Sequence, residues 1–292
     1  MLKTPKMSIG MPVFNGAEML EDVLNNFQNQ TFSDYEIIIS DNGSTDATEI
    51  IARKFASLDN RIRYFRQPNN LGAEKNFLFV LEQATAKYFM WAACDDLRSD
   101  NFLMENIKFL DTNPDYVAST CPNNFGDAND GKPITFDLTG KVEERFANFL
   151  KFCWLSHGIF YSVMRTKVIR ECDILGQSFL GSDWGVDLFL ASRGNVNRTN
   201  VGFTSFGVSG VSSKAGIYKL YRNNIFDWIV PFSNLSKYTL KLASDFSLRN
   251  KIFLILLLTK LNSRTAVNQI HTSLYQLYRN FVDKSVKTTH GV

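Results

Sequence analysis

The stretch Tyr35 to Ser57, YEIIISDNGSTDATEIIARKFAS, decides the fold because it contains a complete unit of strand, turn and helix. YEIIIS is rich in β-branched side chains and predicts a buried strand, whereas ATEIIARKFAS has apolar residues at helical spacing. In the polar turn between them, Asp46 precedes the helix and Glu49 follows three residues later, which predicts a capping box. A strand that leads directly into a helix is the repeating unit of parallel sheets.

The same unit recurs through the first 120 residues. Further strands are expected over residues 7–14, 61–66, 87–93 and 116–120, and further helices over residues 18–30, 74–84 and 101–110. Strands joined through helices pair in parallel with right-handed crossovers, and the helices cover both faces of the sheet. The sequence therefore predicts an α/β fold with a Rossmann-like, mostly parallel sheet flanked by helices.

The pattern changes after residue 122. Residues 123–140 have the composition of a loop, and beyond them we expect helices over 143–152, 166–172 and 182–192, with extended segments over 158–164 and 201–209. From residue 217 the helical pattern continues to the last residue. We therefore divide the chain into a domain of residues 1–216 and an α-helical C-terminal extension of residues 217–292.

The composition is that of an ordinary globular protein, with 45% hydrophobic and 21% charged residues. A formal net charge of +3 is too small to predict a nucleic-acid partner. The sequence contains no signal-peptide pattern, no membrane-span pattern and no CxxC cysteine pair, so the expected location is the cytoplasm. The run KIFLILLLTKL, residues 251–261, favours a buried helix, with peripheral docking on the inner face of the membrane as the alternative.

Polar residues gather where four successive predicted strands end. The segments are PVFNG (residues 12–16), DNGSTD (41–46), QPNNLG (67–72) and CDD (94–96), and ligands of open parallel sheets bind at this edge. Neither GxGxxG nor GxxxxGK[ST] is present, so a dinucleotide loop and a P-loop are unsupported. The repulsion between the adjacent Asp95 and Asp96 would be relieved by a hard cation, Mn²⁺ or Mg²⁺, which could also neutralise a diphosphate.

The ordered set MPVFN, DNGSTDAT, NNLGAEKN and CDDLRSDNFL resembles the family 2 glycosyltransferases, over roughly residues 8 to 209. That resemblance implies a GT-A fold, with a nucleotide-sugar half of about residues 1–122 and an acceptor half of about 123–216. It implies a metal-dependent, inverting hexosyltransferase that uses Mn²⁺ or Mg²⁺ and a nucleotide-sugar donor, with a UDP-sugar favoured. The implied acceptor is a hydroxyl of a glycan or of a lipid-linked substrate, in bacterial surface polysaccharide synthesis.

The resemblance also implies roles for individual residues. In the nucleotide site, Asp41 would read the base edge, Asp95 would contact the ribose, and further contacts would come from Pro12, Phe14, Asn15, Asn70 and Gly72. Asp96 would bind the metal, but Leu97 stands where many members have a third Asp, so the choice between Asp95 and Asp96 as ligand stays open. In GSDWGVDLFLASRG, Asp183 takes the place of the catalytic base, and the acceptor-side candidates are His157, Trp184 and Asp187.

Two other classes of protein remain as alternatives at this point. A nucleotidyltransferase acting on sugar phosphates also combines an α/β sheet, a nucleotide and a hard cation, although PVFNGAE lacks the Lys or Arg that its first loop normally carries. A non-catalytic glycan- or nucleotide-binding protein could keep the same fold. Asp41, Asp46 and Asp183 could also be turn or cap residues, and the sequence leaves a homo-oligomer open.

Overall fold

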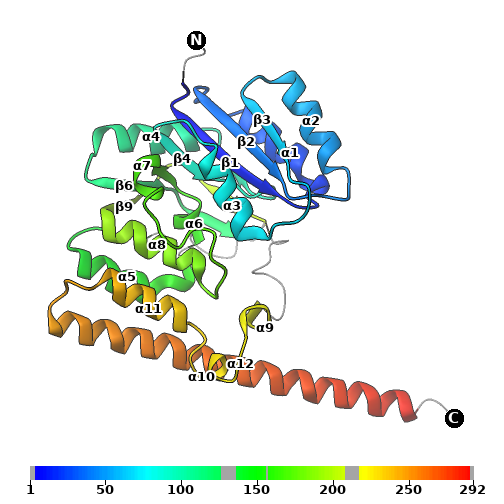
Figure 1. Ribbon diagram of the computed structural model, residues 1–292, viewed down its shortest axis with the longest axis vertical. Helices are drawn as coiled ribbons and strands as arrows, with labels where there is room; N and C mark the ends of the chain where they lie inside the picture. The colour runs from blue at the N-terminus through cyan, green and yellow to red at the C-terminus, as the bar shows by residue number, and fades with distance from the viewer. Residues whose placement is uncertain (1–3, 126–135, 156, 208–216, 290–292) are drawn as a thin grey trace. The chain divides into compact units, whose positions relative to one another are not determined.

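The computed structural model describes residues 4–125, 136–155, 157–207 and 217–289. The chain forms two compact units, the first made of residues 1–178 and 182–214 and the second of residues 179–181 and 215–292. The first unit contains the predicted α/β domain, and the second contains the helices at the end of the chain (Figure 1).

A seven-stranded sheet forms the centre of the first unit, with strand order β3-β2-β1-β4-β8-β6-β9. The pairs β3-β2, β2-β1, β1-β4 and β6-β9 are parallel, and only β8 runs antiparallel to its neighbours β4 and β6. This confirms the mostly parallel α/β sheet. The strands are β1 (Met7–Val13), β2 (Tyr35–Asp41), β3 (Ile62–Arg66), β4 (Tyr88–Trp91), β6 (Tyr116–Thr120), β8 (Val163–Arg165) and β9 (Asn195–Arg198).

Helices cover both faces of this sheet, and its central strands are accordingly buried on both sides. In β1, Met7, Ile9 and Met11 lie in one core with residues of α1, α2 and α4, whereas Gly10 faces α3. A Cβ at Gly10 would lie 2.7 Å from a methyl group of Val80, so glycine allows α3 to approach the strand. The helices of this unit are α1 (Ala17–Gln28), α2 (Thr48–Leu58), α3 (Ala73–Glu82), α4 (Phe102–Thr112), α5 (Val142–Phe152), α6 (His157–Phe160), α7 (Thr166–Ile169) and α8 (Ser182–Arg193), with a 3-10 turn, η1 (Cys153–Leu155).

Several short elements differ from the sequence-based expectations. Residues 158–164 were expected to be one strand, but the structure has α6 up to Phe160 and a strand only from Val163. A strand, β7 (Asn123–Phe125), occupies the start of the expected loop, and it joins β5 (Leu97–Arg98) and β10 (Thr204–Phe206) in a second sheet of order β5-β10-β7. These strands are two or three residues long, too short for a period of two to be recognised.

The second unit is helical, as the sequence predicts. Its helices are α9 (Ile217–Tyr221), α10 (Phe226–Ile229), α11 (Ser233–Leu242) and α12 (Leu248–Thr289). Asn262 on α12 holds the start of α11, because its Oδ1 accepts a hydrogen bond from Phe232 N (2.8 Å) and its Nδ2 donates to Ser236 Oγ (3.1 Å). In the part of the chain that the structure describes, no helix has the length and apolarity required to cross a membrane.

The apolar run in α12 is buried on one face only. Leu254, Leu258 and Leu261 are at most 4% exposed, as the sequence predicts for a buried helix. On the other side, Ile252 and Leu256 are 51% and 60% exposed. The expected burial is therefore found on one face of the helix, and the second face is exposed in the single chain.

Candidate active site

The loop after β1 and the loop after β2 are joined by backbone-to-side-chain hydrogen bonds. Asn15 N donates to Ser44 Oγ (2.9 Å), Gly16 N donates to Thr48 Oγ1 (2.9 Å), and Thr45 N donates to Asn15 Oδ1 (2.8 Å). Asn15 has φ 51°, a left-handed conformation that Asn tolerates better than most residues. The polar residues of these two motifs therefore fix each other's backbone.

Asp46 joins the starts of two helices, and the capping box expected around it is absent. Its Oδ1 accepts a hydrogen bond from Thr48 N (3.0 Å) at the start of α2, and its Oδ2 accepts one from Ala17 N (3.1 Å) at the start of α1. Glu49, the expected partner in the box, instead pairs with Arg53 at 2.8 Å. Asp46 thus caps the starts of both helices, which agrees with its interpretation as a cap residue and not with the capping box that includes Glu49.

Asp41 is fully buried at the end of β2, and its carboxylate is occupied by neighbours. Oδ1 accepts a hydrogen bond from Ser44 N (2.7 Å), while Oδ2 accepts one from Tyr64 OH (2.8 Å) and one from Arg66 Nη1 (2.6 Å). Burial alone would raise the pKa of Asp41, but the bonds from Ser44 and Tyr64 and the charge of Arg66 bring it below its ordinary value. Asp41 therefore shapes the loop, and its proposed contact with a base stays a prediction.

The loop after β3 is held against the end of β2 by Asn42. Asn42 Nδ2 donates to Asn70 Oδ1 (2.9 Å) and to Gly72 O (3.2 Å), and Asn42 Oδ1 accepts a hydrogen bond from Leu71 N (2.8 Å). Gly72 has φ 89°, and a Cβ there would meet no atom within 4 Å. The two nucleotide-site candidates of this loop, Asn70 and Gly72, thus lie beside the loop after β2, with open space next to Gly72.

The loop after β1 also lies against the end of β4. A Cβ at Gly16 would lie 2.8 Å from Cys94 Sγ, in the residue before Asp95. Phe14 is 47% exposed and Pro12 is half-buried. The structure therefore brings together, at the carboxyl edge of the sheet, four loops that hold the predicted nucleotide-site residues; we call them the carboxyl rim, made of residues 12–17, 41–48, 67–72 and 92–96.

The two adjacent carboxylates of the rim have different surroundings. Asp96 is 3% exposed, its Oδ1 accepts a hydrogen bond from Gly207 N (3.1 Å), and its Oδ2 lies 3.6 Å from Nη2 of the buried Arg98. Burial raises the pKa of Asp96 to about 6, although the charge of Arg98 opposes the shift. Asp95 is half-buried, and a Cβ at Gly207 would overlap its Oδ2 at 2.1 Å. Asp96 thus neutralises Arg98, and Asp95 is the more accessible of the pair.

These surroundings test whether the rim could hold Mn²⁺ or Mg²⁺. Among the described residues, no three or more His, Cys, Asp or Glu side chains form a group suited to a metal ion. A hard cation at a phosphate site needs only one or two carboxylates, because water and the substrate's phosphates complete its shell. Asp95 fits this requirement by its accessibility, whereas the contact of Asp96 with Arg98 disfavours Asp96 as the ligand.

Tyr161 is a half-buried phenol whose pKa depends on the carboxylate pair and on Asp183. Burial raises the pKa of Tyr161, and the negative charges of Asp96, Asp183 and Asp95 raise it further. All three carboxylates therefore lie close enough to act on one phenol group. The Asp183 side chain is exposed at the start of α8, yet desolvation by the surrounding protein raises its pKa. An exposed carboxylate with a raised pKa suits proton abstraction near neutral pH.

The acceptor-side candidates are placed differently. Asp187 is 1% exposed and lies near the positive charge of Arg198, so its burial disfavours it as an alternative base. Trp184 is 6% exposed and packs edge-on against Trp154, which is 38% exposed and so presents the accessible ring of the pair. His157 begins α6, and its side chain lies outside the described part of the structure.

Sequence reasoning missed three residues that shape the site. Arg98 follows the acidic pair in the sequence, but nothing in its spacing indicated that it would be buried. Gly207 reaches the pair only because β10 is antiparallel to β5, which is a long-range contact. Arg66 ends β3 and reaches Asp41 across one strand spacing, a pairing that alternation along β3 could have suggested.

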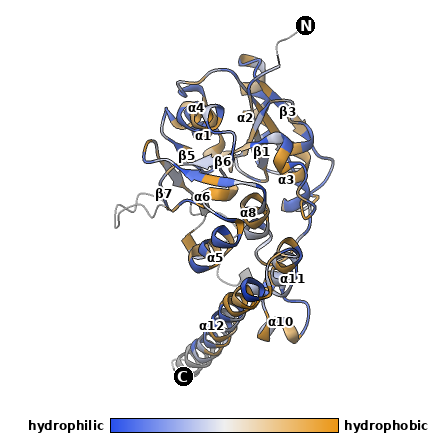
Figure 2. Ribbon diagram, turned by 90° about the vertical axis from the view of Figure 1, so that its left-hand side faces the viewer, coloured by the Kyte–Doolittle hydropathy of each residue, from blue (hydrophilic) through white to orange (hydrophobic). Residues whose placement is uncertain are grey.

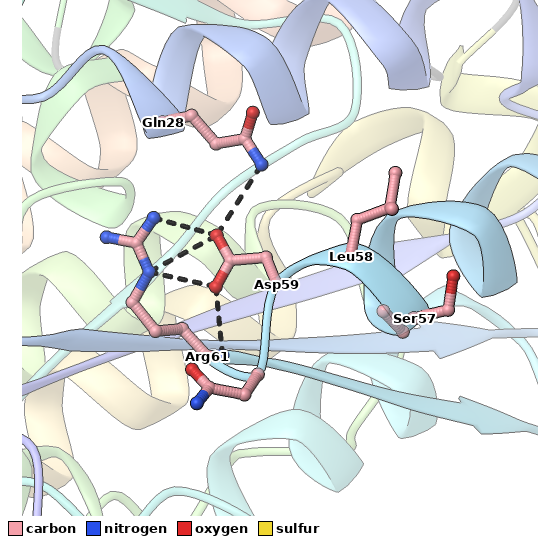
Figure 3. Close-up of a pocket in the computed structure, with 7 residues that line it drawn as sticks. Gln28, Ser57, Leu58, Asp59 and Arg61 are labelled. Carbon is pink, nitrogen blue, oxygen red and sulfur yellow. Dashed lines mark hydrogen bonds and ion pairs between the residues drawn. The ribbon is translucent and has the colours of Figure 1, made fainter.

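A separate hollow lies at the opposite edge of the sheet, where β3 begins. It has a volume of about 440 Å³ and is lined by Gln28 and residues 56–61 (Figure 3). Inside it, Asp59 accepts hydrogen bonds from Arg61 Nη2 (2.7 Å) and Gln28 Nε2 (3.5 Å). The charged groups of this hollow are thus paired with each other, and we place the candidate site at the carboxyl rim.

Comparison with known proteins gives a family match that covers the carboxyl rim. A family model described as Glycosyl transferase family 2 matches residues 8–172, which include all four loops of the carboxyl rim. A GalNAc(5)-diNAcBac-PP-undecaprenol beta-1,3-glucosyltransferase of Campylobacter jejuni is 28% identical over 184 residues, or 61% of this chain and 57% of that protein. The chain thus spans little more than half the length of this relative.

Two solved structures resemble the chain through most of its length. S. aureus TarS 1-349 in complex with UDP-GlcNAc has a TM-score of 0.59 at 16% identity, over 83% of this chain and 73% of that one. The mannosyltransferase PcManGT from Pyrobaculum calidifontis, in complex with GDP-Man and Mn2+, has a TM-score of 0.51 at 15% identity, over 96% and 84%. These likenesses show the GT-A fold. The match to the family model shows that the chain belongs to glycosyltransferase family 2.

Proposed function

We propose that this protein transfers a sugar from a nucleoside diphosphate donor, a UDP-sugar, to a hydroxyl group of a lipid-linked or glycan acceptor. The observation that carries the proposal is the geometry of the carboxyl rim, where the residue before the half-buried Asp95 lies against the loop after β1 and hydrogen bonds join the loops after β1, β2 and β3. The negative charges of Asp95, Asp96 and of the candidate base Asp183 all raise the pKa of Tyr161. The TarS complex with UDP-GlcNAc and the undecaprenol-linked name of the Campylobacter relative support the choice of donor and acceptor.

The proposed reaction is a single displacement that inverts the anomeric centre. Asp183 takes the proton from the acceptor hydroxyl while that oxygen bonds to the anomeric carbon, and the bond to the nucleoside diphosphate breaks. Asp95 would hold Mn²⁺ or Mg²⁺, which would neutralise charge on the departing diphosphate. Asp96 keeps Arg98 neutralised, and so keeps the loop that carries Asp95 in place.

The test combines binding and turnover. A UDP-sugar should raise the melting temperature of the full chain in the presence of Mn²⁺ more than in EDTA, because a ligand of the native state stabilises it by mass action. Release of UDP should then depend on an added lipid-linked or glycan acceptor. Full activity in EDTA would exclude the metal, and release of pyrophosphate from a sugar phosphate and UTP would favour a nucleotidyltransferase. Binding without any turnover would favour a non-catalytic protein.

A further inference from the structure

The second unit of the chain is strongly basic. Residues 215–292 contain eleven Lys and Arg residues and three Asp residues, a formal net charge of +8, although the whole chain carries only +3. The rest of the chain is therefore net negative, at −5. An asymmetry of this kind indicates a polyanionic partner for the basic part.

Helix α12 of the same unit exposes an apolar stripe. Six large apolar residues that are 48% to 68% exposed recur at intervals of three, four or eleven residues, and this spacing places the six on one side of the helix. They are Ile252, Leu256, Val267, Ile270, Leu274 and Tyr278, and we call them the α12 stripe. The stripe extends over roughly 40 Å at 1.5 Å per residue. Figure 2 shows hydrophobic and hydrophilic residues alternating around this helix.

The opposite side of α12 is already used within its own unit. Thr265 and Gln269 are buried there, and Gln269 accepts a hydrogen bond from Arg222 at 3.1 Å. Asn262 on this side holds the start of α11. The α12 stripe is therefore a second apolar surface, separate from the one that builds the unit.

Basic residues stand beside the stripe, and acidic ones do not. Arg249 stands three residues before Ile252, Lys260 four residues after Leu256 and Arg264 three residues before Val267. No Asp or Glu occurs between Phe246 and Val282. Two copies paired along this surface would bring these cations together without a counter-charge, which disfavours a dimer. Apolar side chains flanked by Lys and Arg match a helix that lies in the interface of an anionic membrane.

We infer that α12 docks the protein on the surface of a bilayer rich in anionic phospholipid, with the α12 stripe in the acyl boundary and its Lys and Arg residues among the headgroup phosphates. This inference does not rest on the proposed function, because it concerns only the second unit. The strength of such membrane binding depends both on the apolar area that is buried and on the attraction between basic side chains and anionic lipids.

The test is co-sedimentation of the full chain with vesicles of phosphatidylglycerol and phosphatidylcholine, and with vesicles of phosphatidylcholine alone, without donor or acceptor. We expect binding to the anionic vesicles, weakened roughly 10-fold or more by Ile252→Ser/Leu256→Ser and by Arg249→Glu/Lys260→Glu. The matched control is Ile50→Ser/Leu58→Ser on α2, where the two residues are 73% and 75% exposed, and it should bind like the parent. Circular dichroism should confirm that each variant is folded.

Three results would overturn the inference. The first is no binding to anionic vesicles, and the second is an equal loss of binding in the α2 control. The third is a dimer in sedimentation equilibrium that Leu256→Ser dissociates, which would assign the stripe to a second copy of the chain.

Discussion

Nη2 of Arg98 lies 3.6 Å from Oδ2 of Asp96, and both side chains are almost completely buried. Phe27 and Phe102 lie beside the guanidinium, each with its ring centre 5.5 Å away, so Asp96 is the main source of negative charge for this cation. The acidic pair thus contains one carboxylate that serves the fold and one that is available to a ligand.

We predict that Asp96→Asn destabilises the protein, whereas Asp95→Asn leaves stability nearly unchanged. Removing one partner of a buried ion pair leaves the other charge uncompensated and costs about 3–5 kcal/mol. A change at the half-buried Asp95 should stay within about 0.5 kcal/mol, while transfer activity is lost. Urea unfolding of the two variants measures the difference. Equal stability of both would contradict the structural role of Asp96.

Asp183→Asn should lower the rate of transfer by about 10² to 10⁴ and leave donor affinity unchanged. The carboxylate must be deprotonated to accept a proton, and its pKa is raised, so the acidic limb of the rate profile should lie above the ordinary Asp range near ~4. Steady-state rates between pH 4 and 8, with donor affinity measured by calorimetry, provide the test. If donor affinity falls in proportion to the rate, Asp183 is not the base.

We expect the Tyr161 phenol to donate a hydrogen bond to a charged group of the bound substrate, so Tyr161→Phe should reduce turnover about 10-fold to 100-fold, the usual cost of losing such a bond. The ring contact with Phe206, at 5.7 Å, is retained in this variant, so the melting temperature should stay close to that of the parent. A large drop in stability with normal turnover of the folded fraction would make Tyr161 a packing residue only.

Gly207→Ala should impair the site through Asp95. The added Cβ would lie 2.1 Å from Asp95 Oδ2, so the carboxylate or the end of β10 must move. We expect weaker Mn²⁺-dependent binding of a UDP-sugar, measured by thermal shift, with α/β structure retained by circular dichroism. Parental metal dependence in this variant would show that the position of Asp95 is unimportant.

Asp41 should contribute to stability in a way that disappears in acid. Its pKa is lowered in the folded state, so its contribution is present above the unfolded-state pKa near ~4 and is lost as the pH falls through the folded value. The free energy of unfolding of Asp41→Asn should therefore be lower than that of the parent at pH 7, and the difference should shrink at pH 3. A difference that is constant with pH would contradict this role.

The sequence was sufficient for the parallel part of the sheet because each βα unit there is specified locally. The strand at residues 35–41 and the helix from Thr48 to Leu58 follow from apolar periodicity and turn residues alone. The strands β5, β7 and β10 exist only through pairing between segments about 80 to 110 residues apart, and local spacing carries no signal for that. The arrangement of these strands also gives Asp95 and Asp96 different surroundings. The sequence could not predict this difference, because it shows only two adjacent Asp residues.

Gly10 has a consequence that reaches beyond the core in which it lies. The missing methyl group at this position sets the height at which α3 rests on β1, and the first residue of α3, Ala73, directly follows Gly72 on the rim. Helix α3 thus contacts β1 at Gly10 inside the protein, and its N-terminal end lies beside the open space at Gly72. Substitutions at Gly10 or Val80, which lie outside the rim, should therefore shift the start of α3 and change the space beside Gly72.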